Sequence, residues 1–155
     1  MDSMHPGSHS GHLHAQTGDW LERELAKRPD TPTLLFMHHP PFLTGMGAMD
    51  EPFENVERLG AIVARNPQLR LCFGHMHRPI ITQWHGRTAM TAPAVSMQID
   101  LDLSPGGGDT FRMETPGYLL HHFDNGVWNS HVCQIAVQAT FAGPYPFVGS
   151  VNPTQ

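Results

Sequence analysis

Two histidine groups in this chain have the composition of metal ligands. The first is the segment His38-His39-Pro40-Pro41, and the second is Gly74-His75-Met76-His77. Neutral imidazole binds divalent ions such as Zn²⁺, Mn²⁺, Fe²⁺ and Co²⁺. On an extended or turning segment two nearby histidines can face the same way, and a preceding glycine lets the backbone turn sharply. One such pair among 12 histidines is a weak signal, but the two groups together predict a metal site.

Both groups follow short apolar runs, at residues 33–37 and 70–73, which we predict to be buried strands. Between them we predict a helix over 51–65, capped by Asp50 and with Pro52 in its first turn. Its apolar residues recur at helical spacing: Val56, Leu59, Gly60 and Val63. Strand, helix and strand in this order predict a βαβ unit with parallel strands. Ligands bind beyond the carboxyl ends of such strands, so we expect both histidine groups to face one crevice.

The rest of the chain predicts loops and antiparallel strands around this unit. We expect a loop over residues 1–14 and a helix over 17–28. The loop holds four histidines, which we interpret as loop residues, with an adventitious metal site as the alternative: His5, His9, His12 and His14. Turn signals at 85–87 and 124–126 predict two hairpins. The expected fold class is therefore α/β (an α+β sandwich), a βαβ unit followed by antiparallel strands.

We further expect a partly alternating segment over 95–103, a glycine-rich loop over 104–109 and an irregular tail over 136–155.

Composition excludes several classes of protein. A chain of 155 residues predicts one domain. The net charge of −5 and the lack of a Lys/Arg cluster argue against a partner of duplex nucleic acid. Two cysteines make no disulfide framework, and we expect Cys72 to be a buried free thiol in a reducing compartment. No apolar run is long enough for a membrane helix and no signal-peptide pattern is present, so we expect a cytoplasmic protein without a membrane partner.

The two histidine segments carry a family resemblance. Met37–Pro41 and Phe73–His77 resemble the last two motif blocks of the calcineurin-like metallophosphoesterases. The similarity is greatest to the bacterial branch that includes class III cyclic-nucleotide phosphodiesterases and glycerophosphodiesterases. Further similarity lies in short segments upstream of those blocks: Met1-Asp2-Ser3, Pro6-Gly7, Gly11 and Trp20-Leu21-Glu22. The resemblance covers residues 1–135, which we expect to form the C-terminal portion of such a domain.

The resemblance implies a set of site residues and cofactors. His38 and His75 would bind one divalent ion and His77 a second, with Mn, Fe, Zn or Co as the metals and two ions in a complete site. His39 would support the ligands or face the substrate. The implied reaction is two-metal hydrolysis of a small phosphodiester, a cyclic nucleotide or a glycerophosphodiester, in which a water activated by both ions attacks phosphorus in line.

Three motif blocks of that family do not occur in this sequence: an Asp-x-His block, a bridging Asp and a Gly-Asn-His block. We therefore expect a fragment without the N-terminal metal-binding motifs, and negligible activity unless the missing half comes from elsewhere. One alternative is a non-catalytic metal-binding or self-associating remnant, since an uncovered edge strand invites pairing with another copy into a homo-oligomer. A third hypothesis is a histidine-rich metal-binding protein unrelated to phosphoesterases.

Overall fold

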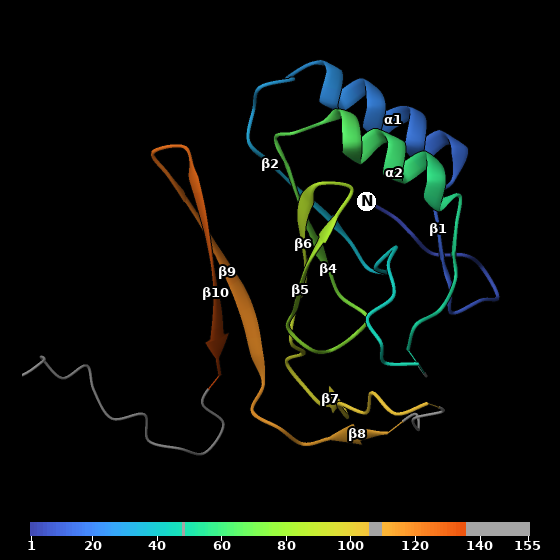
Figure 1. Cartoon of the computed structure of the whole chain (residues 1–155), viewed down its shortest axis with the longest axis vertical. Helices are drawn as coiled ribbons and strands as arrows, with labels where there is room; N and C mark the ends of the chain where they lie inside the picture. Colours follow the sequence, from blue (N-terminus) through green and yellow to red (C-terminus); the bar gives the residue numbers. More distant parts are fainter. Residues whose placement is uncertain (48, 106–109, 136–155) are drawn as a thin grey trace, which may run out of the picture.

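The computed structural model describes residues 1–47, 49–105 and 110–135 (Figure 1). It confirms a mixed α/β fold, with elements in this order: β1 (Gly11–His12), α1 (Ala15–Ala26), β2 (Thr33–Met37), β3 (Phe53–Glu54), α2 (Val56–Arg65), β4 (Leu69–Phe73), β5 (Ile80–Trp84), β6 (Arg87–Thr91), β7 (Gln98–Ile99), β8 (Phe111–Arg112), β9 (Gly117–Asp124) and β10 (Val127–Gln134). The expected tail over 136–155, and most of the expected loop over 104–109, lie outside the described residues.

A four-stranded sheet forms the centre of the fold, in the order β2-β4-β6-β5. Strands β2, β4 and β6 are parallel, and β5 runs antiparallel to β6. The βαβ unit predicted from the sequence is thus confirmed, with Met37 paired opposite Phe73 at the carboxyl end of β2 and β4. The crossover helix α2 joins these two strands (Figure 1).

Helices α1 and α2 lie side by side over one face of the sheet (Figure 1). Alternate strand residues face them, so that Leu35 and Leu71 join Leu59 of α2 in the main core. Leu59 is almost fully buried, which contributes about 1.5–3 kcal/mol relative to leaving such a side chain exposed. Arg58 of α2 pairs with Asp19 of α1 at 2.6 Å. Helix α1 begins and ends two residues earlier than the predicted range of 17–28.

The prediction that the second helix begins at Glu51, capped by Asp50, was wrong. The helix begins at Val56, and the two residues Phe53–Glu54 form β3, which pairs with β1. The carboxylate of Asp50 instead accepts hydrogen bonds from the backbone N–H and hydroxyl of Thr44, both at 2.8 Å, and closes a loop. Pro52 consequently precedes the helix rather than lying in its first turn.

Both predicted hairpins are present. Strands β5 and β6 meet at His85-Gly86 with φ of 46° and 74°, and β9 and β10 meet at Asn125-Gly126 with φ of 48° and 82°. Two central residues with positive φ are typical of type I′ hairpin turns. Strands β5 and β6 extend the central sheet instead of forming a separate one. In the partly alternating segment 95–103, Gln98–Ile99 forms β7.

The β9–β10 hairpin lies against the sheet face opposite the helices. The Sγ of Cys72 and Nε2 of His121 are 3.5 Å apart, and Nη1 of Arg70 donates to Oγ of Ser130 at 3.3 Å. Cys72 is a buried free thiol, as expected, and burial raises the pKa of Cys72 to about 11. Among the described residues, none of the helices has both the length and the apolar character needed to span a bilayer.

Candidate metal centre

The two histidine groups follow β2 and β4 at matched positions. Because Met37 pairs with Phe73, the next residues along each strand, His38 and Gly74, lie side by side. The N–H of Gly74 donates to the carbonyl oxygen of His38 at 3.0 Å. A Cβ atom at Gly74 would lie 3.1 Å from Nδ1 of His38, tighter than ordinary van der Waals contact. Glycine therefore leaves room for the His38 ring at the end of the sheet.

Three imidazoles meet at this edge of the sheet. His38, His39 and His75 each place a ligand nitrogen within 4.8 Å of the other two. The ring centroids of His38 and His75 are 5.3 Å apart, and those of His39 and His75 are 5.0 Å apart. The two segments therefore face one place, as the rule for parallel strands predicts. His77 is not part of this three-residue group among the described residues.

The surroundings keep these imidazoles neutral. Burial, with the nearby His39 and His38, lowers the pKa of His75 to about 4. Partial desolvation, with His39 and His77 nearby, also lowers the pKa of His38. Desolvation lowers the pKa of His39 too, although the hydrogen bond with Ser3 and the nearby charge of Glu51 oppose this shift. Neutral imidazoles have the free lone pairs that a metal ion requires, so the donor set fits a divalent cation.

The Gly74–His77 turn has an unusual backbone. His75 and His77 have φ of 63° and 49°, a left-handed conformation that is uncommon and unfavourable for residues with a Cβ. Met76 between them is fully buried against Met46 and Ile99. Since a buried methionine side chain contributes about 1.5–3 kcal/mol, Met76 offsets the cost of holding both histidines in this conformation.

The ring of His77 is fixed from one side. Its Nδ1 lies 3.2 Å from the carbonyl oxygen of Met97, and a carbonyl only accepts, so Nδ1 carries the proton. The lone pair of Nε2 is then available to a cation, which is the usual arrangement of metal-binding histidines. His77 is among the groups that lower the pKa of His38 and of His75, so its ring lies near the three-residue group.

Ser3 holds the ring of His39. Its hydroxyl oxygen accepts the backbone N–H of His39 at 3.2 Å and lies 3.0 Å from Nδ1 of the same residue. Ser3 is only 2% exposed, so this contact is well defined. It fixes His39 so that the ring lines the cavity, while the role expected for His39 stays a prediction. Reasoning from the sequence missed Ser3 as a site residue, because its contact with His39 joins segments far apart in the chain.

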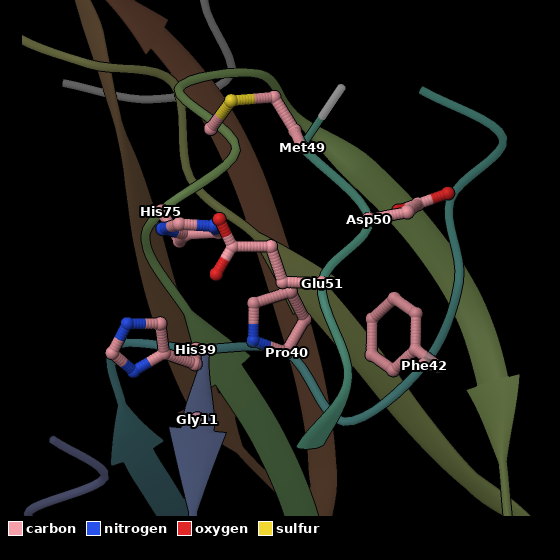
Figure 2. Close-up of a pocket in the computed structure, with 8 residues that line it drawn as sticks. All are labelled: Gly11, His39, Pro40, Phe42, Met49, Asp50, Glu51 and His75. Atoms are coloured by element: carbon pink, nitrogen blue, oxygen red, sulfur yellow. The ribbon is translucent and has the colours of Figure 1, made fainter. Parts of the chain in front are cut away.

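A carboxylate was also missed. One cavity beside the histidines is lined by Gly11, His39, Pro40, Phe42, Met49, Asp50, Glu51 and His75. Figure 2 shows the Glu51 carboxylate extending toward His75, and its charge raises the pKa of His39. From the sequence, Glu51 was expected at the start of the second helix. The sequence signal for Glu51 as a site residue was its position after the glycine-containing loop that follows the His-Pro segment.

A second cavity, of about 260 Å³, also borders these histidines. It is lined by Met4, His5, Ser8, His9, His38, His39 and His75. His39 and His75 line both cavities, of which the first holds only about 10 Å³, room for about one water molecule, and the second is large enough for a small molecule.

Comparisons with known proteins support a phosphodiesterase relationship. The chain is 37% identical over 152 residues to the probable glycerophosphodiester phosphodiesterase GpdQ of Arcobacter nitrofigilis, covering 95% of this chain and 54% of that protein. It is 36% identical to the glycerophosphodiester phosphodiesterase GpdQ of Enterobacter lignolyticus, covering 94% and 51%. It is 33% identical to a 3′,5′-cyclic-nucleotide phosphodiesterase of a Nostoc species, covering 79% and 46%.

No protein-family model matches the chain. The chain spans about half the length of the curated relatives that it matches. These relatives carry the two names that the motif resemblance implies, glycerophosphodiester phosphodiesterase and cyclic-nucleotide phosphodiesterase. The chain therefore belongs to the calcineurin-like metallophosphoesterases, in the branch that contains these bacterial phosphodiesterases.

Proposed function

We propose that this chain supplies part of a divalent-metal centre that hydrolyses small phosphodiesters, of the glycerophosphodiester or cyclic-nucleotide class. The observation that carries the proposal is the convergence of His38, His39 and His75 at the carboxyl ends of β2 and β4. The names of the relatives support the substrate class.

In this proposal His38 and His75 hold one cation and His77 holds a second, with Mn, Fe, Zn or Co as the metals. When bound, such ions lower the pKa of water and offset the negative charge of phosphate oxygens. The neutral state of His38 and His75 favours binding because no proton has to be removed first. The Nδ1 contact of His77 with Met97 holds that ring with its other nitrogen free.

His39 and Glu51 have supporting roles in the proposal. Ser3 fixes the His39 ring at the wall of both cavities, where it can donate to a phosphate oxygen or support the neighbouring ligands. Glu51 brings a negative charge close to His39. This charge favours a bound cation and disfavours a bare anionic substrate, so we expect substrate to bind after the metal.

The remaining ligands of a complete two-ion site would come from outside this sequence, since the carboxylate-containing blocks of the family do not occur in it. The missing half of a longer chain or a second copy would provide them. Strand β2 ends the central sheet on one side. An edge of this kind invites pairing, so we propose self-association as the route by which the isolated chain would complete a site.

The test combines metal binding with hydrolysis of bis(p-nitrophenyl) phosphate by the chelator-stripped chain. Mn²⁺ or Zn²⁺ would be titrated into the parent chain, His75→Ala and His131→Ala. The last variant is the matched control because His131 is an exposed histidine of β10, outside the described imidazole group. We expect His75→Ala to bind the tightest ion more than about 10-fold more weakly. Replacing a residue that only supports a metal ligand already lowers metal affinity by about 10–100-fold.

The outcomes separate the parts of the proposal. Metal binding that depends on His75, without turnover above the His75→Ala background, would support a partial centre. Turnover that depends on metal and on His75 would mean that the site is completed by self-association, which light scattering of the active species would reveal. Metal binding unaffected by His75→Ala would contradict the proposed centre.

A further inference from the structure

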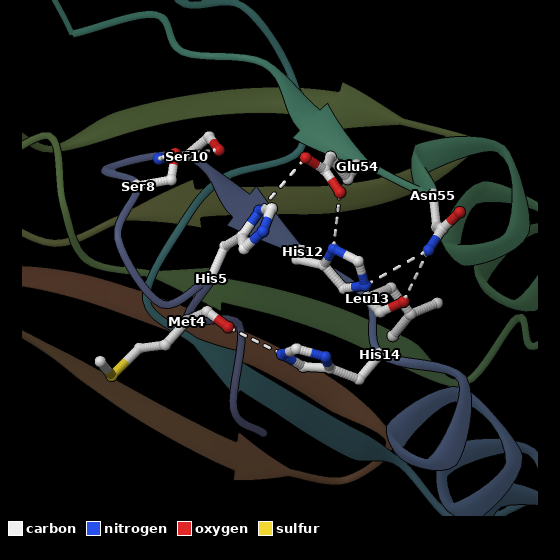
Figure 3. Close-up of polar contacts among 9 residues, drawn as sticks. All are labelled: Met4, His5, Ser8, Ser10, His12, Leu13, His14, Glu54 and Asn55. Carbon is white, nitrogen blue, oxygen red and sulfur yellow. Dashed lines mark hydrogen bonds and ion pairs between the residues drawn. The ribbon is translucent and has the colours of Figure 1, made fainter.

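A second group of metal-ligand side chains lies in the N-terminal segment. His5, His12 and Glu54 each place a ligand atom within 4.8 Å of the other two. The parallel pairing of β1 with β3 sets His12 opposite Glu54. The preceding loop returns to β1 through a bridge between Met4 and Gly11, which brings His5 to the same place. Figure 3 shows both imidazoles directed at the Glu54 carboxylate.

Both oxygens of Glu54 face an imidazole nitrogen. Nδ1 of His12 lies 2.8 Å from Oε2, and Nδ1 of His5 lies 3.1 Å from Oε1. The His5 nitrogen is shielded from solvent, yet it has no partner with hydrogen-bond geometry. Because a hydrogen bond requires alignment as well as distance, an ion pair leaves this buried nitrogen unsatisfied. A cation between the ring and the carboxylate would satisfy it.

The surrounding contacts position His12 as a ligand. Nε2 of His14 donates to the carbonyl oxygen of Met4 at 2.7 Å, and the His14 ring lies 4.3 Å from that of His12. The side-chain amide of Asn55 lies 3.4 Å from Nε2 of His12, at the long limit for a hydrogen bond. Binding of an ion at Nδ1 of His12 would move the ring proton to Nε2, where this long contact opposes it only weakly.

The chemistry of the group selects the ion. Two imidazoles and one carboxylate form a ligand set typical of zinc with an open fourth position, and ligand atoms on a tetrahedral zinc ion lie about 3.3 Å apart, given bonds of about 2.0–2.2 Å. The observed separations, 2.8 Å to Oε2 and 3.1 Å to Oε1 of Glu54, are shorter than this spacing, so a bound ion would replace the His12–Glu54 hydrogen bond and spread the side chains slightly. We infer that His5, His12 and Glu54 form a Zn²⁺ site separate from the histidine group at the end of the sheet.

This site would stabilise one wall of the larger cavity. His5 lines that cavity together with His38 and His75, while Glu54 belongs to β3. An ion held by His5, His12 and Glu54 would tie the N-terminal loop to β3 and fix the part of the cavity wall that His5 forms. None of these three residues is a ligand in the proposed function, so the two ideas stand on different side chains.

The experiment removes the sheet-edge group first. In a His38→Ala/His75→Ala background, the chelator-stripped full chain would be titrated with Zn²⁺ by calorimetry. Bound zinc would be counted by elemental analysis after desalting. The same background would carry Glu54→Gln, His12→Ala or His9→Ala. His9 is the matched control, because it is an exposed histidine of the same loop outside the three-residue group.

We expect the background to bind a single Zn²⁺ and to unfold at a higher temperature when zinc is present. His9→Ala should behave like the background. Glu54→Gln and His12→Ala should bind Zn²⁺ at least about 10-fold more weakly. Glu54→Gln keeps the size of the side chain, and its unfolding without metal would show that weaker binding does not come from a misfolded loop.

Three results would overturn the inference: no zinc binding by the background, no effect of Glu54→Gln, or equal weakening by His9→Ala, which would indicate a loose histidine-rich chelator. The proposed function fails separately. If zinc binding by the otherwise unaltered chain is lost with His75→Ala alone, the sheet-edge centre is supported and the second site is refuted. If binding persists in the background and is lost with Glu54→Gln, the second site is supported whatever the hydrolysis assay shows.

Discussion

The close approach of Gly11 to two site residues makes a quantitative prediction. A Cβ atom at this position would lie 2.4 Å from Cδ2 of Phe53 and 2.7 Å from Cβ of His39. Carbon atoms in packed proteins lie about 3.5–4.0 Å apart, so Gly11→Ala requires displacements of about 1 Å. Phe53 cannot move freely, because it pairs with Gly11 in the β1–β3 ladder and packs in the main core.

Overpacking of this kind costs about 1–3 kcal/mol. The smaller entropy of alanine in the unfolded chain offsets part of this cost, by about 0.4–1 kcal/mol. We therefore expect Gly11→Ala to lower the free energy of unfolding by about 1–2 kcal/mol. For a chain of this size, that change corresponds to a fall in Tm of about 2–8 °C.

The assay is thermal unfolding followed by circular dichroism in chelator, with Gly47→Ala as the matched control. A Cβ atom at Gly47 would meet no atom within 4 Å, so its Tm should stay equal to that of the parent chain or rise slightly. A Tm of Gly11→Ala equal to that of Gly47→Ala would refute the close approach of β1 to Phe53 and His39. A fall in Tm restored by Phe53→Leu would confirm which contact is responsible.

Three further predictions follow from burial. Met76→Ala should lower the free energy of unfolding by about 2–5 kcal/mol in urea titrations, because the buried side chain leaves a cavity; a loss under about 1 kcal/mol would contradict its anchoring role. The pKa of His75 is lower in the folded chain than the ordinary value of 6.5, so the unfolded state takes up the proton first and the metal-free chain should lose stability as pH falls from about 6.5 to about 4. The loss is about 1–2 kcal/mol after allowance for solvent at the half-exposed ring, and a pH profile unchanged in His75→Gln would argue against it. Cys72, whose pKa is raised to about 11, should resist iodoacetamide until the chain unfolds, as mass spectrometry of the native protein can show; rapid native labelling of Cys72 would contradict its burial.

The sequence predicted the elements whose signals are local. The apolar run Thr33–Met37 is bounded by Pro32 and the His-Pro segment, and β2 has these bounds. The second helix was predicted to begin too early because Phe53–Glu54 is held by pairing with Gly11–His12. That pairing joins segments about 40 positions apart, and local helix propensity carries no information about it.

The same distinction between local and long-range signals applies to the candidate site. The convergence of His38 and His75 could be predicted, because two adjacent parallel strands end at one edge of a sheet. The hydrogen bond of Ser3 with His39 and the charge of Glu51 near it could not be predicted, since each brings together loops whose relative positions depend on the whole fold. The interpretation of His5 and His12 as loop residues was wrong for His12, which lies on β1. Only the fold reveals that Glu54 lies beside both.

The parallel pairing of β2 with β4 has a consequence for the order of events during folding. His38 and His75 come together only when this ladder forms, and the ladder forms only after the chain between its strands has closed a long loop. Non-local pairings of this kind form late and slowly compared with helices and hairpins. A metal ion arriving early would find isolated imidazoles, so metal capture at the sheet edge should follow folding rather than guide it.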